Sequence, residues 1–209
     1  MDDANAFTDA RDLARAKRGD LAAFNALVER HQHTLFAVSL RMLGDSQAAA
    51  DVTQDSIFAA WQRLRDFKSG NFRSWLVRIA VNRCYDQLRS RQRHHDASFD
   101  ELLEVNPGTE LLAGQATDPA DLLLDSDLAK ALLDGLHVLP VDQRAVVILC
   151  DVQGFSYNEA AEVEGTQVGT IKSRLSRGRA RLRDWLAERP ELLPATARST
   201  FARSSERTG

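Results

Sequence analysis

Residues 157–183 read YNEAAEVEGTQVGTIKSRLSRGRARLR, and this stretch decides how the C-terminal part of the chain folds. A short helix with the small residues Ala160 and Ala161 is predicted to stop at Gly165, and a second helix to begin around Gln167. Small side chains on the first helix and a glycine in the turn allow two helices to cross closely. The segment therefore predicts a helix-turn-helix, a motif whose second helix enters the major groove of DNA.

The second helix of this motif has distinct faces at about 100° per residue. Its apolar face consists of Ile171, Leu175, Gly178, Leu182 and Leu186. Ser173 and Arg177 lie nearly opposite, and cations flank them on both sides, as contacts with base edges and phosphates require. A solvated basic face is the alternative, but residues 166–183 hold six Lys and Arg and no Asp or Glu, whereas solvated faces usually mix signs.

A second basic helix is predicted from about Phe72 to Arg93. Opposite its apolar stripe lie an amide, guanidinium groups and a carboxylate at positions i, i+1, i+4 and i+7, contributed by Asn82, Arg83, Asp86 and Arg89. Such groups can hydrogen-bond base edges. A solvated polar face explains this pattern equally well.

The net charge of −3 hides a strong segregation of charge along the chain. Residues 63–95 hold nine Lys and Arg and two Asp and Glu, and residues 166–183 hold six Lys and Arg and no Asp or Glu. Residues 96–121 lie between them with seven acidic residues, no Lys or Arg, and the turn signals Pro107-Gly108 and Asp118-Pro119. Two basic stretches inside periodic helices fit the electrostatic footprint of nucleic-acid binding.

Helical periodicity dominates the chain, and no segment alternates convincingly with a period of two. We therefore expect an all-α fold made of two small helical domains joined by a flexible acidic linker. The first domain is expected over residues 10–95, the linker over 96–121, the second domain over 122–187 and a flexible tail over 188–209.

Several classes of protein are excluded by the sequence. No run of about 18 apolar residues is present, so no membrane insertion is expected, and the acidic start Met1-Asp2-Asp3 is not a secretory signal. Cys84 and Cys150 lie in apolar segments and read as buried thiols of a cytoplasmic protein. His31 and His33 point away from each other on one helix, and no constellation of nucleophile, base and orienting group is visible. Neither an enzyme nor a metal or cofactor site is expected.

Two blocks of motifs, in this order, resemble the sigma factors of bacterial RNA polymerase. Residues 51–61 (DVTQDSIFAAW) and 72–86 (FRSWLVRIAVNRCYD) resemble sigma region 2. Residues 139–149 (LPVDQRAVVIL), followed by 154–161 and 169–175, resemble sigma region 4. The chain is short, with only a linker between the regions, and in this it resembles the extracytoplasmic-function class.

The resemblance implies a promoter-specificity subunit that binds core RNA polymerase, recognises promoter DNA and initiates transcription, under the control of an anti-sigma factor. Contact with core polymerase is implied for Asp51, Gln54, Asp55, Phe58 and Trp61. Contact with the −10 element is implied for Lys68, Asn71, Asn82, Arg83, Asp86 and Arg89. Contact with the −35 element is implied for Thr170, Lys172, Ser173, Arg174, Ser176, Arg177 and Arg179.

Two features stand beside this resemblance. Glu164 occupies a position where relatives usually carry an apolar residue, just before the turn glycine. The acidic linker is expected to fold back on the basic faces, so that the free chain binds DNA poorly.

The alternative function is a stand-alone helix-turn-helix regulator, which would leave residues 51–86 without a role.

Overall fold

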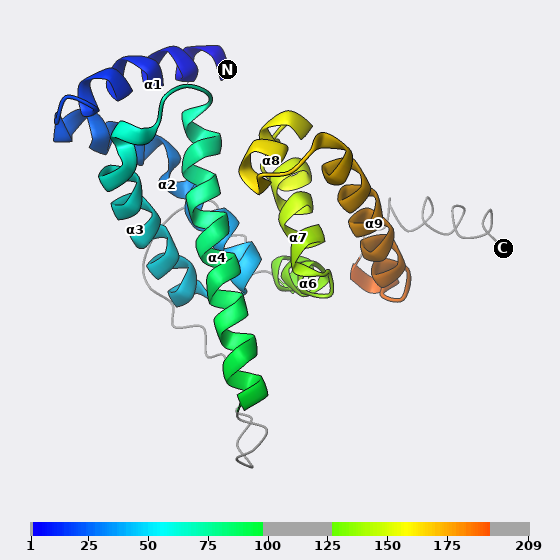
Figure 1. The fold of residues 1–209 in the computed structure, drawn as a ribbon. Coiled ribbons are helices and arrows are strands. Elements are labelled where there is room, and N and C mark those ends of the chain that lie inside the picture. Colours follow the sequence, from blue (N-terminus) through cyan, green and yellow to red (C-terminus); the bar gives the residue numbers. More distant parts are fainter. Residues whose placement is uncertain (1, 98–126, 193–209) are drawn as a thin grey trace.

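The computed structural model describes residues 2–97 and 127–192, and every regular element in these two ranges is a helix. The all-α class predicted from the sequence is confirmed. Helices α1 to α4 form the first domain and α6 to η4 the second domain (Figure 1). Most of the predicted linker and tail falls outside the described residues. The helices are α1 (Asp2–Ala16), α2 (Leu21–Leu43), α3 (Ser46–Arg63), η1 (Leu64–Asp66), α4 (Phe72–Ala97), α6 (Asp127–His137), α7 (Val141–Val147), η3 (Ile148–Val152), α8 (Tyr157–Glu164), α9 (Val168–Ala187) and η4 (Pro190–Leu192).

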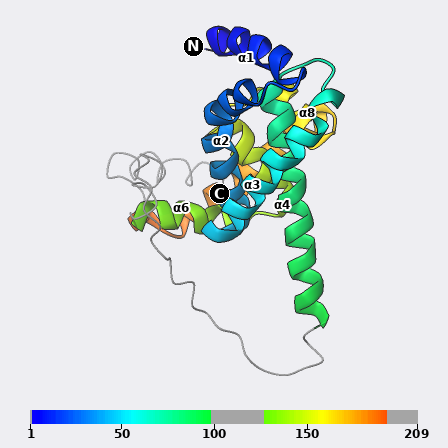
Figure 2. The same cartoon turned by 90° about the vertical axis from the view of Figure 1, so that its left-hand side faces the viewer.

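The first domain is built on three long helices whose apolar stripes face one another. Leu27, Leu35 and Met42 of α2 are fully buried, as are Leu76 and Val81 of α4. α4 lies beside α2 and α3, and its C-terminal part projects beyond the rest of the domain (Figures 1 and 2). Arg89, Arg91 and Arg93, near this end of the helix, are exposed.

α1 is joined to α2 by an ionic network that is largely out of water. Arg30 donates hydrogen bonds to Asp9 at 2.9 Å and to Asp12 at 2.8 Å. The Nε2 atom of His31 lies 2.7 Å from the Asp9 carboxylate. Burial opposes ionisation of Asp9, but the bonds from His31 and Arg30 outweigh it and lower the pKa of Asp9. His31 thus serves packing within the first domain.

The start of α4 is fixed by an aromatic cluster and a side-chain cap. Phe67, Phe72 and Trp75 pack together, with ring centroids 5.3–5.9 Å apart. The Asn71 side chain accepts a hydrogen bond from the backbone N–H of Ser74 at 3.2 Å, which satisfies one of the free donors of the first turn. The short loop that the sequence predicts before α4 is therefore held at both ends.

The second domain contains the predicted helix-turn-helix in α8 and α9. Ser156 and Glu159 cap the start of α8 reciprocally, and Gly165 ends it in a left-handed conformation with φ of 62°. α9 then begins at Val168, and its residues Ile171 and Leu175 are buried in the core. The predicted turn and the predicted apolar face of the second helix are both confirmed.

One local feature of this domain was not predicted from the sequence. α7 continues into η3, a single π-helical segment over Ile148–Val152. Beside it, α9 approaches α7 closely, because a Cβ atom added to Gly178 would lie only 2.8 Å from Cγ2 of Val147. Because residue 178 is glycine, α9 can pack closely against α7.

The two domains share one continuous hydrophobic core. The buried Arg144 of α7 donates to the carbonyl of Met42 in α2 at 2.7 Å, and to the carbonyl of Leu136 in α6 at 3.0 Å. It also donates to the carbonyls of His137 at 3.1 Å and Leu139 at 3.3 Å. The last carbonyls of a helix have no partner within it, so one guanidinium satisfies the ends of two helices from different domains.

The described ranges contain no helix that is long and apolar enough to cross a membrane.

Both cysteines of the chain are described: Cys84 is buried and Cys150 is half-buried, and neither forms a disulfide. Burial raises the pKa of each thiol to about 11. The prediction of a buried thiol is confirmed for Cys84, whereas Cys150 is only half-buried.

The junction of the domains also depends on Gly44, the C-cap of α2. Its φ of 73° is left-handed, and a Cβ atom there would lie 2.3 Å from Cε1 of His137 in α6. Gly154 has a similar φ of 69°, but a Cβ atom there would meet nothing within 4 Å. Substitutions at Gly44 and Gly154 therefore cause similar backbone strain, but only a substitution at Gly44 also produces a steric clash between the domains.

We expect Gly44→Ala to lower the free energy of unfolding by clearly more than Gly154→Ala. Both changes place an alanine in a left-handed conformation at a cost of about 1 kcal/mol. Gly44→Ala adds a clash with the half-buried ring of His137, which we expect to cost a further ~1–3 kcal/mol. Chemical denaturation of the full chain measures both values. Equal losses would show that His137 does not restrict this position.

Candidate nucleic-acid and protein interfaces

The outer face of α9 presents polar side chains over a buried apolar face. Leu175 is buried, whereas Ser173, Ser176 and Arg177 are exposed. Arg177 lies back along its own helix, and its Nε and Nη2 atoms donate to the carbonyl and hydroxyl oxygens of Ser173, both at 3.2 Å. These bonds are exposed and internal to one turn, so the guanidinium can exchange them for base edges at little cost.

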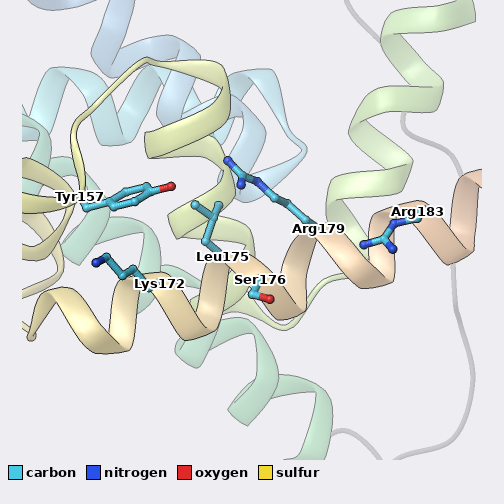
Figure 3. A pocket seen from close by; sticks show the side chains of 6 residues that line it. All are labelled: Tyr157, Lys172, Leu175, Ser176, Arg179 and Arg183. Carbon is cyan, nitrogen blue, oxygen red and sulfur yellow. The ribbon is translucent and has the colours of Figure 1, made fainter. Parts of the chain in front are cut away.

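Cations flank this face on the side of α8. Lys172 is exposed, and Arg179 forms an ion pair with Asp151, with a distance of 2.9 Å between its Nε and a carboxylate oxygen. Both line a pocket of about 290 Å³ together with Tyr157, whose ring faces this side of α9 (Figure 3). Thr170, also predicted to contact DNA, is half-buried in the first turn of α9. The pocket wall combines cations and hydroxyl groups, which suits a phosphate oxygen.

On the other flank, Arg174 is held within the protein. Its side chain is 25% exposed, and it pairs with Glu164 of α8 and Asp142 of α7, each at 3.1 Å. The Glu164 carboxylate also accepts hydrogen bonds from the Tyr85 hydroxyl at 3.0 and 3.1 Å. Burial raises the pKa of Glu164, and burial beside this carboxylate raises the pKa of Tyr85. Glu164, for which the sequence comparison led us to expect an apolar environment, thus takes part in a buried polar network.

The predicted −10 residues of α4 are mostly accessible. Asn82, Asp86 and Arg89 are exposed, and Arg89 pairs with Asp86 at 3.1 Å. Arg83 is half-buried and pairs at 3.1 Å with Asp55 of α3, which is predicted to bind polymerase. One ion pair therefore joins residues that the sequence assigns to two different partners.

The loop before α4 contacts the second domain. Lys68 is exposed, whereas the Asn71 amide donates to a carboxylate oxygen of Glu159 in α8 at 2.8 Å. This bond crosses from one domain to the other. Of the two loop residues predicted to contact the −10 element, only Lys68 therefore stands clear of the second domain.

α2 and α3 form a groove of about 370 Å³ with an apolar floor. Phe58 on its wall is 61% exposed, whereas Trp61 is half-buried and stacks at 4.9 Å on Phe24. Large exposed apolar side chains in a contiguous patch mark protein contact sites. The groove is lined by Leu21, Phe24, Asn25, Gln54, Asp55, Ile57, Phe58 and Trp61.

Of the five predicted polymerase contacts on α3, Trp61 is half-buried and the other four are exposed: Asp51, Gln54, Asp55 and Phe58. Asp51 lies outside the groove lining and accepts a hydrogen bond from Gln47 at 3.1 Å. The sequence analysis did not identify Leu21, which lines the groove and is 56% exposed. Its exposure could have been expected from its position as the first residue of α2, because the first residue of a helix often lies outside the core.

Comparison with known proteins assigns both domains. Residues 27–94 match the family model described as Sigma-70 region 2, and residues 129–182 match that described as Sigma-70, region 4. The chain is 35% identical to the ECF RNA polymerase sigma factor SigM of Mycobacterium tuberculosis, over 84% of this chain and 83% of that one. It is 33% identical to the ECF RNA polymerase sigma factor SigE of Mycolicibacterium smegmatis, over 81% of this chain but only 65% of that relative.

A solved structure is also similar. It is the co-crystal structure of the sigma factor RpoE in complex with the anti-sigma factor NepR from Bartonella quintana. The TM-score is 0.60 at 31% identity, and the match covers 78% of this chain and 96% of that chain. The similarity therefore extends over both helical domains.

We expect Arg177→Ala and Lys172→Ala to weaken DNA binding in different ways. Arg177 lies at the centre of the exposed face, so its loss should relax preference at one base pair of the upstream element, by about 1–3 kcal/mol. Lys172 lies at the flank, so its loss should weaken all sequences alike and reduce the salt dependence. Binding of holoenzyme to a set of singly substituted duplexes measures both effects. Loss of preference at the same base pair in both variants would contradict this assignment.

Proposed function

Because this chain belongs to the sigma-70 family, and within it to the extracytoplasmic-function class, we propose that it directs core RNA polymerase to a specific set of promoters. The observation that carries this proposal is the exposed polar face of α9, which lies over buried Leu175 and contains no acidic residue between Val168 and Arg183. Such a helix can contact base edges with Arg177 and Ser173 while its other side stays packed.

We propose that the second domain binds the −35 element as duplex DNA. Ser173, Ser176 and Arg177 would face the bases, and Thr170, Lys172 and Arg179 would hold the phosphates on one side. Arg174 would hold phosphates on the other side once it leaves Glu164. The ion pair of Arg179 with Asp151 is exposed, so it can open at a cost of at most about 1 kcal/mol.

We propose that the first domain binds and helps to open the −10 element. Asn82, Arg83, Asp86 and Arg89 would contact bases along α4. Lys68 and Asn71 belong to the loop that would receive an extruded base. Extrusion costs a few kcal/mol of stacking, so a preformed pocket next to the aromatic cluster of Phe67 would favour strand opening.

We propose that the groove between α2 and α3 receives core polymerase. An exposed phenyl ring beside a half-buried indole offers an apolar anchor, and the carboxylates of Asp51 and Asp55 and the amide of Gln54 provide a polar rim. A stand-alone regulator would have no use for this groove.

We also propose how this chain is regulated, which molecule carries out catalysis and where in the cell this chain acts. A relative of similar fold was solved with an anti-sigma factor, and we propose that this chain is also held inactive by such a partner. Catalysis would belong to the polymerase, since the role of this subunit is to recognise promoters. It would act in the cytoplasm, where the polymerase and the chromosome are.

Reconstituted transcription tests the proposed function directly. Run-off transcription with core polymerase and genomic DNA should yield discrete start sites that require this chain, and upstream segments shared among them define the two elements. A chain that binds genomic fragments but gives no start sites with core polymerase would favour the stand-alone regulator.

We expect Phe58→Ala to weaken binding to core polymerase by about 10- to 100-fold, because a truncated central anchor typically costs ~1.5–3 kcal/mol. Its exposure in the free chain means that folding should change little. Leu132→Ala, at a leucine that is 57% exposed on α6, is the matched control and should leave core binding unchanged. Titration of labelled chain with core polymerase measures both. Equal affinity of the two variants would remove the groove from the polymerase interface.

A further inference from the structure

α4 of the first domain lies directly against α8, the first helix of the helix-turn-helix. Arg73 donates to the carbonyl of Gln153 at 2.7 Å, and its guanidinium stacks at 4.1 Å on the ring of Phe155. Asn71 donates to Glu159 as described above, and Tyr85 donates to Glu164. Polar contacts with the second domain thus extend from Asn71, in the loop before α4, to Tyr85 in the middle of α4.

The contact at Glu164 differs from the others because it involves the recognition helix. The carboxylate side chain is only 2% exposed, and its hydrogen bonds come from Tyr85 of the first domain and Arg174 of α9. A buried carboxylate is stable only while enough donors satisfy it. Loss of either partner would leave a charged group out of water with incomplete hydrogen bonding.

The docked arrangement brings the two DNA-reading helices close together. Asn82 lies one helical turn from Tyr85, and Arg177 lies one turn from Arg174, so the two reading surfaces are on the order of 30 Å apart at most. The −35 and −10 elements are separated by about 25 base pairs, or about 85 Å of duplex at ~3.4 Å per base pair. One docked molecule cannot contact both elements.

The chain outside the described ranges is long enough to permit separation. Residues 98–126 join α4 to α6, and a fully extended segment of this length spans on the order of 100 Å. Covalent connection therefore does not prevent the domains from reaching both elements.

We propose that Glu164 is an autoinhibitory clasp, which holds the second domain on α4 through Tyr85 and at the same time holds Arg174 away from DNA. The inference rests on the proposed reading of promoter DNA by α9. When Arg174 moves to a phosphate, Glu164 loses a donor, and separation of the domains then exposes the carboxylate to water. DNA binding by α9 and docking on α4 are therefore mutually unfavourable, and each weakens the other by the same factor.

This clasp differs from masking by the acidic linker, which we expected from the sequence. The linker residues lie outside the described ranges, whereas Tyr85, Glu164 and Arg174 belong to the folded helices. A substitution in the first domain should accordingly change the affinity of the second domain for DNA.

Tyr85→Phe in the full chain tests the proposal, because it removes one hydroxyl from α4 and leaves the second domain unaltered. Loss of a hydrogen bond to a buried carboxylate should weaken docking about tenfold. If the docked form dominates, the affinity of the free chain for a 30-base-pair duplex should rise about 5- to 10-fold. The duplex is taken from upstream of a start site used by the reconstituted holoenzyme. Ser90→Ala, which also removes a hydroxyl from α4, is the matched control and should change nothing.

A second measurement reports docking without DNA. Dyes on Ala50→Cys of α3 and Asp184→Cys of α9, in a chain with Cys150→Ser, should show lower energy transfer after Tyr85→Phe and unchanged transfer after Ser90→Ala. Asp142→Asn releases Arg174 from a partner within its own domain, so it should leave energy transfer unchanged.

The outcomes separate the clasp from the proposed function. Lower energy transfer together with tighter DNA binding supports the clasp. A change in only one of the two, or in neither, overturns it. If holoenzyme selects no promoter, the proposed function fails, while the energy-transfer measurement still decides whether Tyr85 holds the domains together.

Discussion

The arrangement of this molecule depends on one buried guanidinium. Arg144 donates four hydrogen bonds to backbone carbonyls, and three of these belong to the end of α6 and the turn after it, while the fourth belongs to Met42 near the end of α2. A buried cation needs its donors satisfied, so Arg144 holds the ends of α2 and α6 together in the docked arrangement. Gly44 follows directly and gives His137 room to pack. The other hydrogen bonds between the domains join α4 and the loop before it to residues 153–164.

The helix-turn-helix shows how the net charge of a chain can mislead. Acidic residues outside α9 balance its cations: Asp151 pairs with Arg179, and Asp142 and Glu164 pair with Arg174. Two of the six cations of α9, Arg174 and Arg179, are thus held by acidic side chains in the described structure. The surface offered to DNA is therefore smaller than the count of basic residues implies.

Local rules sufficed to predict the elements from the sequence, but the docking of the domains depended on long-range contacts. The end of α8 at Gly165 and the buried face of α9 followed from helical periodicity and the preference of glycine for left-handed φ. Phe58 was assigned to a candidate contact surface only through the family resemblance, because periodicity alone allowed it to be core, and the structure places it on the surface. The bond between Tyr85 and Glu164 joins positions far apart in the chain, and no pattern in either helix indicates it.

The state of the two thiols limits what the chain can sense by itself. With a pKa of about 11, Cys84 and Cys150 are each ionised in only about one molecule in ten thousand at pH 7, and peroxides react with the thiolate rather than the thiol. The sequence contains no other cysteine. In this folded form neither thiol is therefore poised to react with an oxidant, and an oxidising signal that acts on a thiolate would reach this chain through a partner molecule, as a change in binding rather than in its own covalent structure.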